Sequence, residues 1–206
     1  SVGFVGASDN DPGDTLTFAL TQNFDHAFAI NAATGEVTVS APTPDAPLTN
    51  YEVKNIYSIE VAVTDDAVPP ATATRLFEVR VTDANDPPVL ADAAMSVPES
   101  AAAGATVGAP MRATDDDVGT TLTYALTAGN GDGAFRIDGA GQISVADAAA
   151  LDFETTPAYS VTVTVTDDGL GNSGSGTAST TATATIQVVN VNERPVVAAA
   201  SRTVVE

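Results

Sequence analysis

The chain lacks cysteine, has a single histidine, and carries only 7 basic residues against 27 acidic ones. Without cysteine there are no disulfide bonds and no thiolate metal sites, and one imidazole cannot complete a zinc cage. The formal net charge of −20 argues against a nucleic-acid or anionic-membrane partner, because both would repel the chain. The sequence also lacks an apolar run near the roughly 18 residues that a membrane span requires.

Strong net charge is common in disordered chains, but those chains are usually poor in hydrophobic residues. Here 44% of the residues are hydrophobic, which is enough to form packed cores. We therefore expect the acidic residues to be gathered at particular places and neutralised there by a cation. No leader pattern opens the sequence, as expected of a fragment from a longer extracellular protein.

The sequence contains a tandem duplication, in which three segments recur in the same order 102 to 107 residues later. The pairs are "DTLTFALT" at 14–21 with "TTLTYALT" at 120–127, "FAINAATGEVTVS" at 28–40 with "FRIDGAGQISVA" at 135–146, and "NYEVKNIYSIEVAVTDD" at 50–66 with "DFETTPAYSVTVTVTDD" at 152–168. Two copies of one domain type are therefore expected in series.

Each copy shows the two-residue periodicity of β-strands. In "YSVTVTVTD" the valines at 161, 163 and 165 alternate with threonines, so the two residue types point to opposite faces. "LTYAL", "FRIDG" and "GQISV" predict three more short strands, and 171–185 is expected to be a loop that runs into an edge strand. About seven short strands per hundred residues, without a convincing amphipathic helix, predict an all-β fold of two tandem Greek-key antiparallel β-sandwiches.

The phase of the duplication predicts the domain limits. Residues 1–86 are expected to form one repeat without its first strand, and residues 87–193 to form a complete repeat. Residues 194–206 repeat the start of the second copy and place Glu206 where that copy has Glu99. This segment is either the first strand of a following repeat or a strand donated to the open first repeat of a neighbouring molecule.

Acidic residues of the second copy fall in four clusters at strand ends or turns. The clusters are "PES" with Glu99, "TDDD" with Asp115 and Asp117, "LDFE" with Asp152 and Glu154, and "TDDG" with Asp167, and the segment between the copies adds Asp83, Asn85 and Asp86. Because turns collect at the two ends of a sandwich, these acids can converge where consecutive domains meet. Packed carboxylates raise one another's pKa unless a cation lies between them. About six to eight hard oxygen ligands suit Ca²⁺ better than Mg²⁺, which prefers a stricter geometry.

In this order and spacing, "PES", "TDDD", "LDFE", "VTDDG" and "DANDPP" resemble the motifs of the cadherin repeat. That family is marked by Pro-Glu near its start, Asp-x-Asp, Leu-Asp-x-Glu, Asp-x-Gly and the linker Asp-x-Asn-Asp-Asn. The resemblance covers both copies, and "NVNERP" is similar to the Asn-Glu-Pro ending of bacterial cadherin-like repeats. It implies non-enzymatic repeats that bind Ca²⁺ at their junctions, which stiffens the array and supports adhesion.

The resemblance also implies a ligand set for each junction. The set inside this chain would be Asn50, Glu52, Asp83, Asn85, Asp86 and the Pro87 carbonyl from the first side, with Asp115, Asp117, Asp167 and a carbonyl near Thr120 from the second. The family's initial Glu for this junction has no counterpart in the chain, and Asn50 replaces the usual Asp, so the outermost ion would lose ligands. A junction with a following repeat would use Glu99, Asp152, Glu154, Asn190, Asn192 and Glu193, and one with a preceding repeat would use Asp9, Asp11 and Asp65.

Other interpretations of the acidic residues have less support. Isolated aspartates are expected to be turn residues that bond backbone groups, namely Asp14, Asp25, Asp45, Asp132 and Asp147. Asp152 and Glu154 have the residue types of a glycosidase acid and nucleophile, but residues two apart on a strand flank one ligand, and no aromatic platform accompanies them. Aromatic residues at matching positions of the two copies are expected in the cores: Phe18, Phe28, Tyr57, Tyr124, Phe135 and Tyr159.

We therefore expect a non-enzymatic, extracellular or cell-surface module whose repeats are stiffened by Ca²⁺. Its partners would be Ca²⁺ and other copies of itself or neighbouring repeats, in adhesion or in a filament. The alternative is a carbohydrate-binding module of a secreted protein, which would bind polysaccharide through exposed aromatic side chains. Only 5% of the residues are aromatic, mostly at positions expected in the core, which favours adhesion or assembly.

Overall fold

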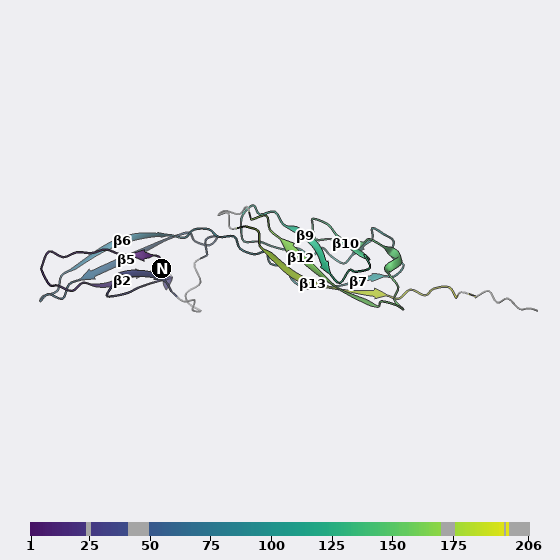
Figure 1. Ribbon diagram of the computed structural model, residues 1–206, viewed down its shortest axis with the longest axis horizontal. Helices are drawn as coiled ribbons and strands as arrows, with labels where there is room; N and C mark the ends of the chain where they lie inside the picture. Colours follow the sequence, from purple (N-terminus) through teal and green to yellow (C-terminus); the bar gives the residue numbers. More distant parts are fainter. Residues whose placement is uncertain (24–25, 41–49, 170–175, 196, 198–206) are drawn as a thin grey trace, which may run out of the picture. The chain divides into compact units, whose positions relative to one another are not determined.

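The computed structural model describes all residues except 24–25, 41–49, 170–175, 196 and 198–206. The chain forms two compact units, Ser1–Ala84 and Asn85–Glu206, and each contains two small β-sheets (Figure 1). The predicted fold class, two tandem β-sandwiches, is confirmed. The repeat limits at 86 and 193, which come from the sequence motifs, remain predictions. Among the described residues, no helix is long and apolar enough to cross a membrane.

The described part of the first unit contains six strands. They are β1 (Gly3–Phe4), β2 (Thr17–Asn23), β3 (Phe28–Ile30), β4 (Glu36–Val39), β5 (Ile56–Thr64) and β6 (Thr72–Arg80). Strands β1, β4 and β3 form one antiparallel sheet, and β2, β5 and β6 form the other. The buried core contains Phe18, Ala27, Phe28, Val37, Tyr57, Ile59 and Val61.

The second unit contains seven strands in its described part. They are β7 (Ala93–Pro98), β8 (Thr106–Val107), β9 (Thr123–Ala128), β10 (Phe135–Ile137), β11 (Ile143–Val145), β12 (Ala158–Thr166) and β13 (Ser179–Val189), and one 3-10 turn, η2 (Ala148–Ala150), precedes β12. One sheet has the order β10-β11-β8 and the other β7-β13-β12-β9. Strand β7 runs parallel to β13, whereas β12 is antiparallel to both of its neighbours.

Strand β12 shows why the alternating sequence folds as predicted. Val161, Val163 and Val165 are fully buried in the core, whereas the threonines between them are only partly buried. Each buried valine stabilises the fold by roughly 1.5–3 kcal/mol relative to leaving it in water. On the outer face, the hydroxyls of Thr127 and Thr164 lie 2.8 Å apart and share a hydrogen bond across neighbouring strands.

The duplication extends from the sequence to the packing of the cores. The rings of Phe28 and Tyr57 meet edge to face with centroids 5.3 Å apart, and those of Phe135 and Tyr159 do so at 5.0 Å. Such edge-to-face pairs add to the stabilisation that comes from burial alone. The Tyr159 hydroxyl lies 2.6 Å from the carbonyl oxygen of Ala150, and burial raises the pKa of Tyr159 to about 12.

One expectation about the second unit is wrong. Segment 171–185 was expected to run into an edge strand, but β13 lies inside its sheet, between β12 and β7. Its inward-facing residues Ala182, Ala184 and Ile186 are buried. Two of the three are alanines, so β13 lacks the run of large hydrophobic residues that is typical of an interior strand.

Candidate functional site

Several carboxylates gather at the end of the second unit where the chain enters it. The Asp86 backbone N–H donates to Asp117 Oδ2 at 2.8 Å, and the Asn85 side-chain amide donates to Asp167 Oδ2 at 3.1 Å. These two bonds tie the entering segment to two different loops of the sandwich. The same end therefore brings the Asn85 side chain and the Asp86 backbone N–H to carboxylates of the loop before β9 and of the loop after β12.

The loops hold these carboxylates through their own backbone groups. The Asp117 N–H donates to Asp115 Oδ1 at 2.9 Å, and the N–H groups of Gly169 and Ala178 donate to Asp167, each at 2.9 Å. Asp117 is only 5% exposed and Asp167 only 3%. Carboxylates are rarely this buried unless they are paired or bind a metal.

Three buried oxygens at this end have no hydrogen-bond donor in the described part of the chain: Asp115 Oδ2, Asp117 Oδ1 and Thr120 Oγ1. Burial raises the pKa of Asp115, and the neighbouring charges of Asp117 and Asp167 raise it further. A buried carboxylate oxygen without a donor is costly, and a bound cation would remove that cost. Hard oxygen atoms without thiolate or imidazole ligands fit Ca²⁺.

The predicted ligands from the first unit lie around a turn before β5 and in the segment after β6. Asn50 Oδ1 accepts a hydrogen bond from the Val53 N–H at 3.0 Å, so Asn50 also has a turn role. Carboxylate oxygens of Glu52 and Asp83 lie within 4.8 Å of each other. Glu52 and Asp83 thus bring two carboxylates together within the first unit, and Asn50 lies in the turn next to Glu52. A role for the Pro87 carbonyl remains a prediction, and Pro87 itself is exposed.

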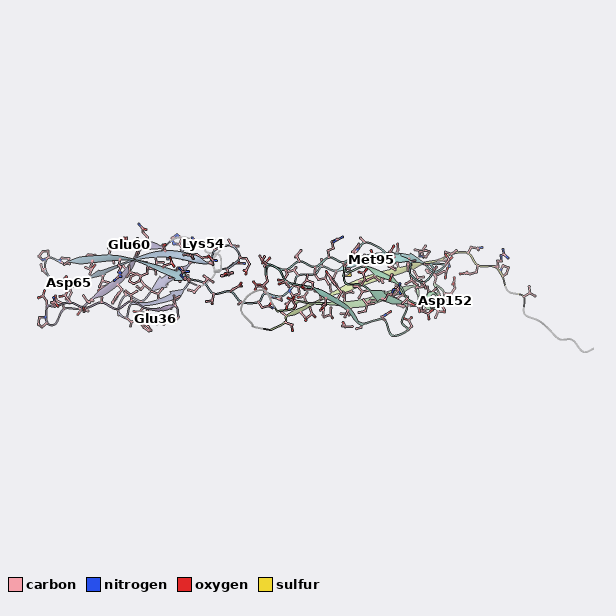
Figure 2. All side chains as sticks on the ribbon, turned by 90° about the horizontal axis from the view of Figure 1, so that it is seen from above. Glu36, Lys54, Glu60, Asp65, Met95 and Asp152 are labelled. Atoms are coloured by element: carbon pink, nitrogen blue, oxygen red, sulfur yellow. The ribbon has the colours of Figure 1, made fainter. Side chains whose placement is uncertain are left out.

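A second carboxylate cluster lies at the end of the second unit where β7 finishes. Oxygens of Glu99, Asp152 and Glu154 all lie within 4.8 Å of one another, and Figure 2 shows Asp152 at that end. Glu99 accepts hydrogen bonds from the backbone N–H groups of Phe153, at 2.9 Å, and of Val191. The predicted ligands of a following junction are thus brought together.

The remaining predicted ligands of that cluster come from the segment after β13. The Asn190 side-chain amide donates to Glu154 Oε1 at 2.7 Å, and Asn192 and Glu193 line a cleft of about 560 Å³ beside it. The hydrogen bond from Val191, followed by that from Phe153, lowers the pKa of Glu99. Desolvation raises the pKa of Glu193, and the charge of Glu99 adds to the rise.

A third cluster lies in the first unit, close to the loop between β5 and β6. Carboxylate oxygens of Asp9, Asp11 and Asp14 lie within 4.8 Å of one another, and the Asp11 N–H donates to Asp9 Oδ1 at 2.8 Å. Desolvation raises the pKa of Asp14, and the charges of Asp66, Asp11, Asp9 and Asp65 raise it further.

Asp65 and Asp14 also lie at this end of the first unit. Asp65, labelled in Figure 2, accepts a hydrogen bond from the Ala71 N–H at 2.9 Å. Asp14 was expected to be a turn residue and not a ligand, yet it joins the cluster. Its counterpart in the second copy is Thr120, so a comparison of the two copies gave no signal for it.

Other aspartates of the second unit behave as the turn residues they were expected to be. Asp147 Oδ1 accepts from the Ala149 N–H at 2.9 Å and caps η2. Asp132 Oδ1 accepts from the Ala134 N–H at 3.2 Å. Asp25 and Asp45, also expected in turns, lie outside the described residues.

Comparison with known proteins gives this arrangement a family context. The family model of the cadherin domain matches residues 93–189. Mouse protocadherin Fat 4 is 34% identical over 160 residues, which cover 75% of this chain and 3% of that protein. Human cadherin-23 is 33% identical over 187 residues, which cover 78% of this chain and 5% of that protein. The chain thus corresponds to a small part of the curated relatives it matches.

Solved structures share the fold. Human protocadherin-24 EC1-2, form II, has a TM-score of 0.64 at 23% identity, covering 92% of this chain and 88% of that chain. Mouse cadherin-23 EC22-24 has a TM-score of 0.54 at 26% identity, covering 85% of this chain and 53% of that chain. The β-sandwich fold of this chain is therefore the one found in these two solved structures.

Proposed function

We propose that these cadherin repeats, which are extracellular and non-enzymatic modules, form a calcium-stiffened segment of an adhesion or filament-forming protein. The observation that carries the proposal is the set of buried oxygens without donors on Asp115, Asp117 and Thr120. They lie on the loop before β9, which accepts a hydrogen bond from the Asp86 backbone N–H. A cation bound there would act directly on the segment that links the two units.

The proposed mechanism is electrostatic. Two carboxylates ~4 Å apart repel each other by about 4 kcal/mol at an effective dielectric constant near 20. Bound Ca²⁺ would neutralise this repulsion and accept oxygen ligands from both sides of the linker. The proposed ligands are Asn50, Glu52 and Asp83 from the first unit, with Asn85, Asp86, the Pro87 carbonyl, Asp115, Asp117 and Asp167 from the second. The linker would then be fixed in the presence of calcium and free to bend without it.

The two outer clusters are proposed to be half-sites for neighbouring repeats. Glu99, Asp152 and Glu154 would serve a following repeat, and Asp9, Asp11 and Asp65 a preceding one. Asp14 adds a fourth carboxylate to the latter group. The ending "NVNERP" supports a microbial surface protein as the parent, whereas the relatives compared above are animal proteins.

Assembly would use contacts between copies or neighbouring repeats. Residues 196–206 repeat the segment that contains β7, which supports strand donation as one route to a filament. Apart from Val197, these residues lie outside the described part of the chain. Deletion of residues 196–206 should abolish concentration-dependent oligomers if strands are exchanged, and should leave them unchanged if they are not.

Carbohydrate binding is the second candidate and has less support. It needs exposed aromatic rings side by side, whereas the aromatic pairs Phe28–Tyr57 and Phe135–Tyr159 are buried. Phe4 is 71% exposed but comes from the short edge strand β1. We therefore place adhesion or assembly first.

Calcium titration by calorimetry, together with limited proteolysis of the linker, tests the proposed site. The parent chain should bind Ca²⁺ and should become resistant to cleavage near residues 81–88 when calcium is added. An Asp115→Asn, Asp117→Asn double variant should lose both effects. Asp116→Asn makes the same charge change on the exposed residue between them and should behave like the parent. A cleavage pattern that EDTA does not alter in the parent would contradict the proposal.

A further inference from the structure

Each unit contains one loop with the pattern Asp-x-Asp-x-Gly-x. These acidic loops are residues 9–14 in the first unit and residues 115–120 in the second. In both loops the backbone N–H of the third residue donates to the first aspartate, at 2.8 Å in the first unit and 2.9 Å in the second. The glycine has a positive φ in both, +104° at Gly13 and +89° at Gly119, a conformation that favours glycine. The two loops therefore follow the same backbone course, and their last residue takes the same place in each.

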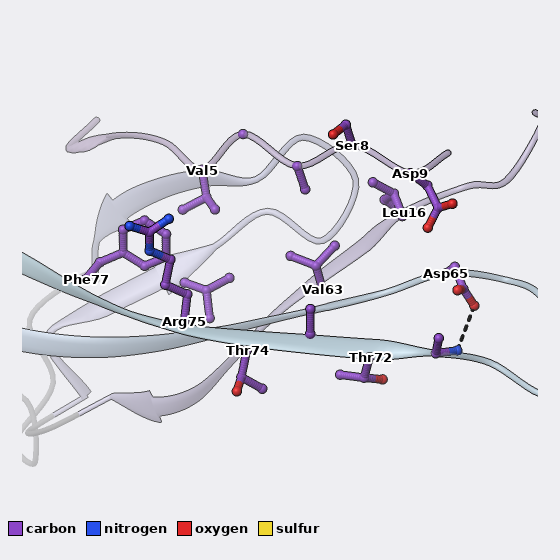
Figure 3. Close-up of a pocket in the computed structure, with 15 residues that line it drawn as sticks. Val5, Ser8, Asp9, Leu16, Val63, Asp65, Thr72, Thr74, Arg75 and Phe77 are labelled. Carbon is purple, nitrogen blue, oxygen red and sulfur yellow. Dashed lines mark hydrogen bonds between the residues drawn. The ribbon is translucent and has the colours of Figure 1, made fainter. Parts of the chain in front are cut away.

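The last residue of the first acidic loop is Asp14, and its side chain turns toward the other carboxylates. One oxygen of Asp14 lies within 4.8 Å of oxygens of both Asp9 and Asp11. Figure 3 shows Asp9 and Asp65 at the same end of the hollow that they line. The last position of the loop therefore places a side-chain oxygen in the same group as the two aspartates of the pattern.

The last residue of the second acidic loop is Thr120, whose hydroxyl oxygen is buried. Thr120 Oγ1 has no hydrogen-bond partner in the part of the chain that the structure describes. Asp117 Oδ1 on the same loop is also buried without a donor there, and Asp117 is only 5% exposed. A hydroxyl oxygen can offer two lone pairs, and burying it without a partner costs free energy. A cation close to both oxygens would remove this cost.

The surroundings of Thr120 are the carboxylate end of the second unit. The consecutive residues 85–86 donate hydrogen bonds to Asp167 and Asp117, so these two carboxylates lie close together. The backbone N–H of Thr120 donates to the Asp117 carbonyl oxygen at 3.5 Å, which keeps Thr120 beside Asp117. The hydroxyl thus belongs to the same group of oxygens as the carboxylates.

We propose that the Thr120 hydroxyl is a ligand of the calcium ion in the second unit, and that the side chain at this position sets the calcium affinity of each acidic loop. The inference rests on the calcium site proposed above and adds a side chain to it. The resemblance to the cadherin repeat implies only a backbone carbonyl near Thr120. Ca²⁺ accepts about six to eight oxygen ligands, and the number of charged ligands tunes its affinity. A hydroxyl adds a ligand without a charge, whereas a carboxylate adds both.

The two acidic loops therefore differ in calcium affinity. The first loop offers three clustered carboxylates, whereas the second offers Asp115, Asp117 and a neutral hydroxyl. The first loop binds calcium more tightly, and without calcium it holds more like charges together. As calcium falls, the second loop releases its ion first. That loop accepts the hydrogen bond from the Asp86 N–H, so the segment between the units is the first to lose its support.

Calcium titration of the full chain by calorimetry tests the assignment, and the binding phase missing from an Asp115→Asn, Asp117→Asn variant marks the ion of the second unit. Thr120→Val keeps the shape without the hydroxyl and should weaken this phase about three- to tenfold. Thr120→Ser should recover a Kd within about twofold of the parent value. Thr120→Asp copies Asp14 and should strengthen the phase about three- to tenfold. Thr121→Asp adds the same charge to the exposed next residue and should change the Kd less than about twofold.

Thermal unfolding distinguishes a ligand from a hydroxyl that supports the fold. Removing a buried hydroxyl without a partner should leave the Tm of Thr120→Val in EDTA equal to that of the parent or higher. A Tm lowered equally in EDTA and in calcium, or a Kd for Thr120→Val within about twofold of the parent value, would overturn the assignment of the hydroxyl. A Thr120→Asp variant that binds calcium no more tightly than Thr121→Asp would overturn the role of this position in affinity.

Failure of this inference can be told apart from failure of the calcium proposal. A parent chain that loses no binding phase in the Asp115→Asn, Asp117→Asn variant would overturn the calcium site, and this inference with it. A parent chain that loses that phase, together with Thr120 variants that bind calcium as the parent does, would leave the calcium site standing and remove only the role of Thr120.

Discussion

Replacing Asp117 by asparagine should reduce the stabilisation that calcium gives to the second unit and should leave its stability in EDTA equal or higher. Asp117 is buried, its Oδ2 accepts from the Asp86 N–H, and its Oδ1 has no donor among the described residues. Asparagine keeps the size and one acceptor oxygen but removes a negative charge. In EDTA this relieves repulsion with Asp115, whose pKa is raised by burial and then by the charge of Asp117.

The size of the effect follows from linkage. Extracellular calcium modules bind with Kd values of roughly 0.1–1 mM. At a Kd of about 0.1 mM, 10 mM calcium stabilises the folded unit by about 2.7 kcal/mol, which raises Tm by roughly 10 °C for a domain of this size. A tenfold weaker site in Asp117→Asn would leave about 1.4 kcal/mol, close to half of the shift.

Thermal unfolding followed by circular dichroism, in EDTA and in 10 mM calcium, measures the stability without the ion and the stabilisation that calcium adds. Asp116→Asn provides the matched control, because it removes the same charge from an exposed neighbour. If Asp117→Asn lowers Tm equally in both buffers, Asp117 supports the fold and not an ion. If calcium leaves the Tm of the parent unchanged, the reasoning about the buried oxygens is refuted.

The packing and pH behaviour of the sandwiches give three further predictions. Ile186→Ala should lower the free energy of unfolding by about 2–5 kcal/mol, because Ile186 is fully buried, whereas Val189→Ala on the same strand should cost less than half of that. Gly129→Ala should destabilise by about 1–3 kcal/mol, because φ is +76° and a Cβ would lie 1.8 Å from a backbone oxygen, whereas Gly131→Ala meets nothing within 4 Å. Burial and neighbouring carboxylates raise the pKa of Asp115, so the folded state holds that proton more tightly than the unfolded state. In EDTA, the stability that Asp115→Asn gains over the parent should therefore shrink as pH falls toward 4. Urea unfolding of both proteins at pH 7 and pH 4 measures this gain, and a gain that is equal at the two pH values would contradict the prediction.

The prediction of β-strands rested mainly on the alternation of valine and threonine. Val161, Val163 and Val165 are buried as their spacing predicted, because a strand of period two has only two faces. The position of β13 inside its sheet could not be predicted in the same way. Its place depends on parallel pairing with β7, which begins some 85 residues earlier, and no local pattern encodes such a long-range contact.

The acidic residues of the candidate sites likewise include some that the sequence could predict and some that it could not. The resemblance to the cadherin repeat placed Glu99, Asp152 and Glu154 in one ligand set, and the structure brings their oxygens together. The resemblance did not identify Asp14, because the tandem copy has a threonine there and because a lone aspartate beside a glycine is typical of a turn. Which oxygens lack donors also depends on the folded loops, since each loop uses its own N–H groups differently.

The most direct test of the central claim measures the distance between the two units with and without calcium. The chain has no cysteine, so Ser58→Cys and Thr185→Cys introduce two unique spin-label positions on exposed strand residues, one in each unit. Double electron–electron resonance should give a narrow distance distribution in calcium and a broad one in EDTA, with the narrow distribution restored when calcium returns. Distributions of equal width in both buffers would contradict the claim that calcium stiffens the array.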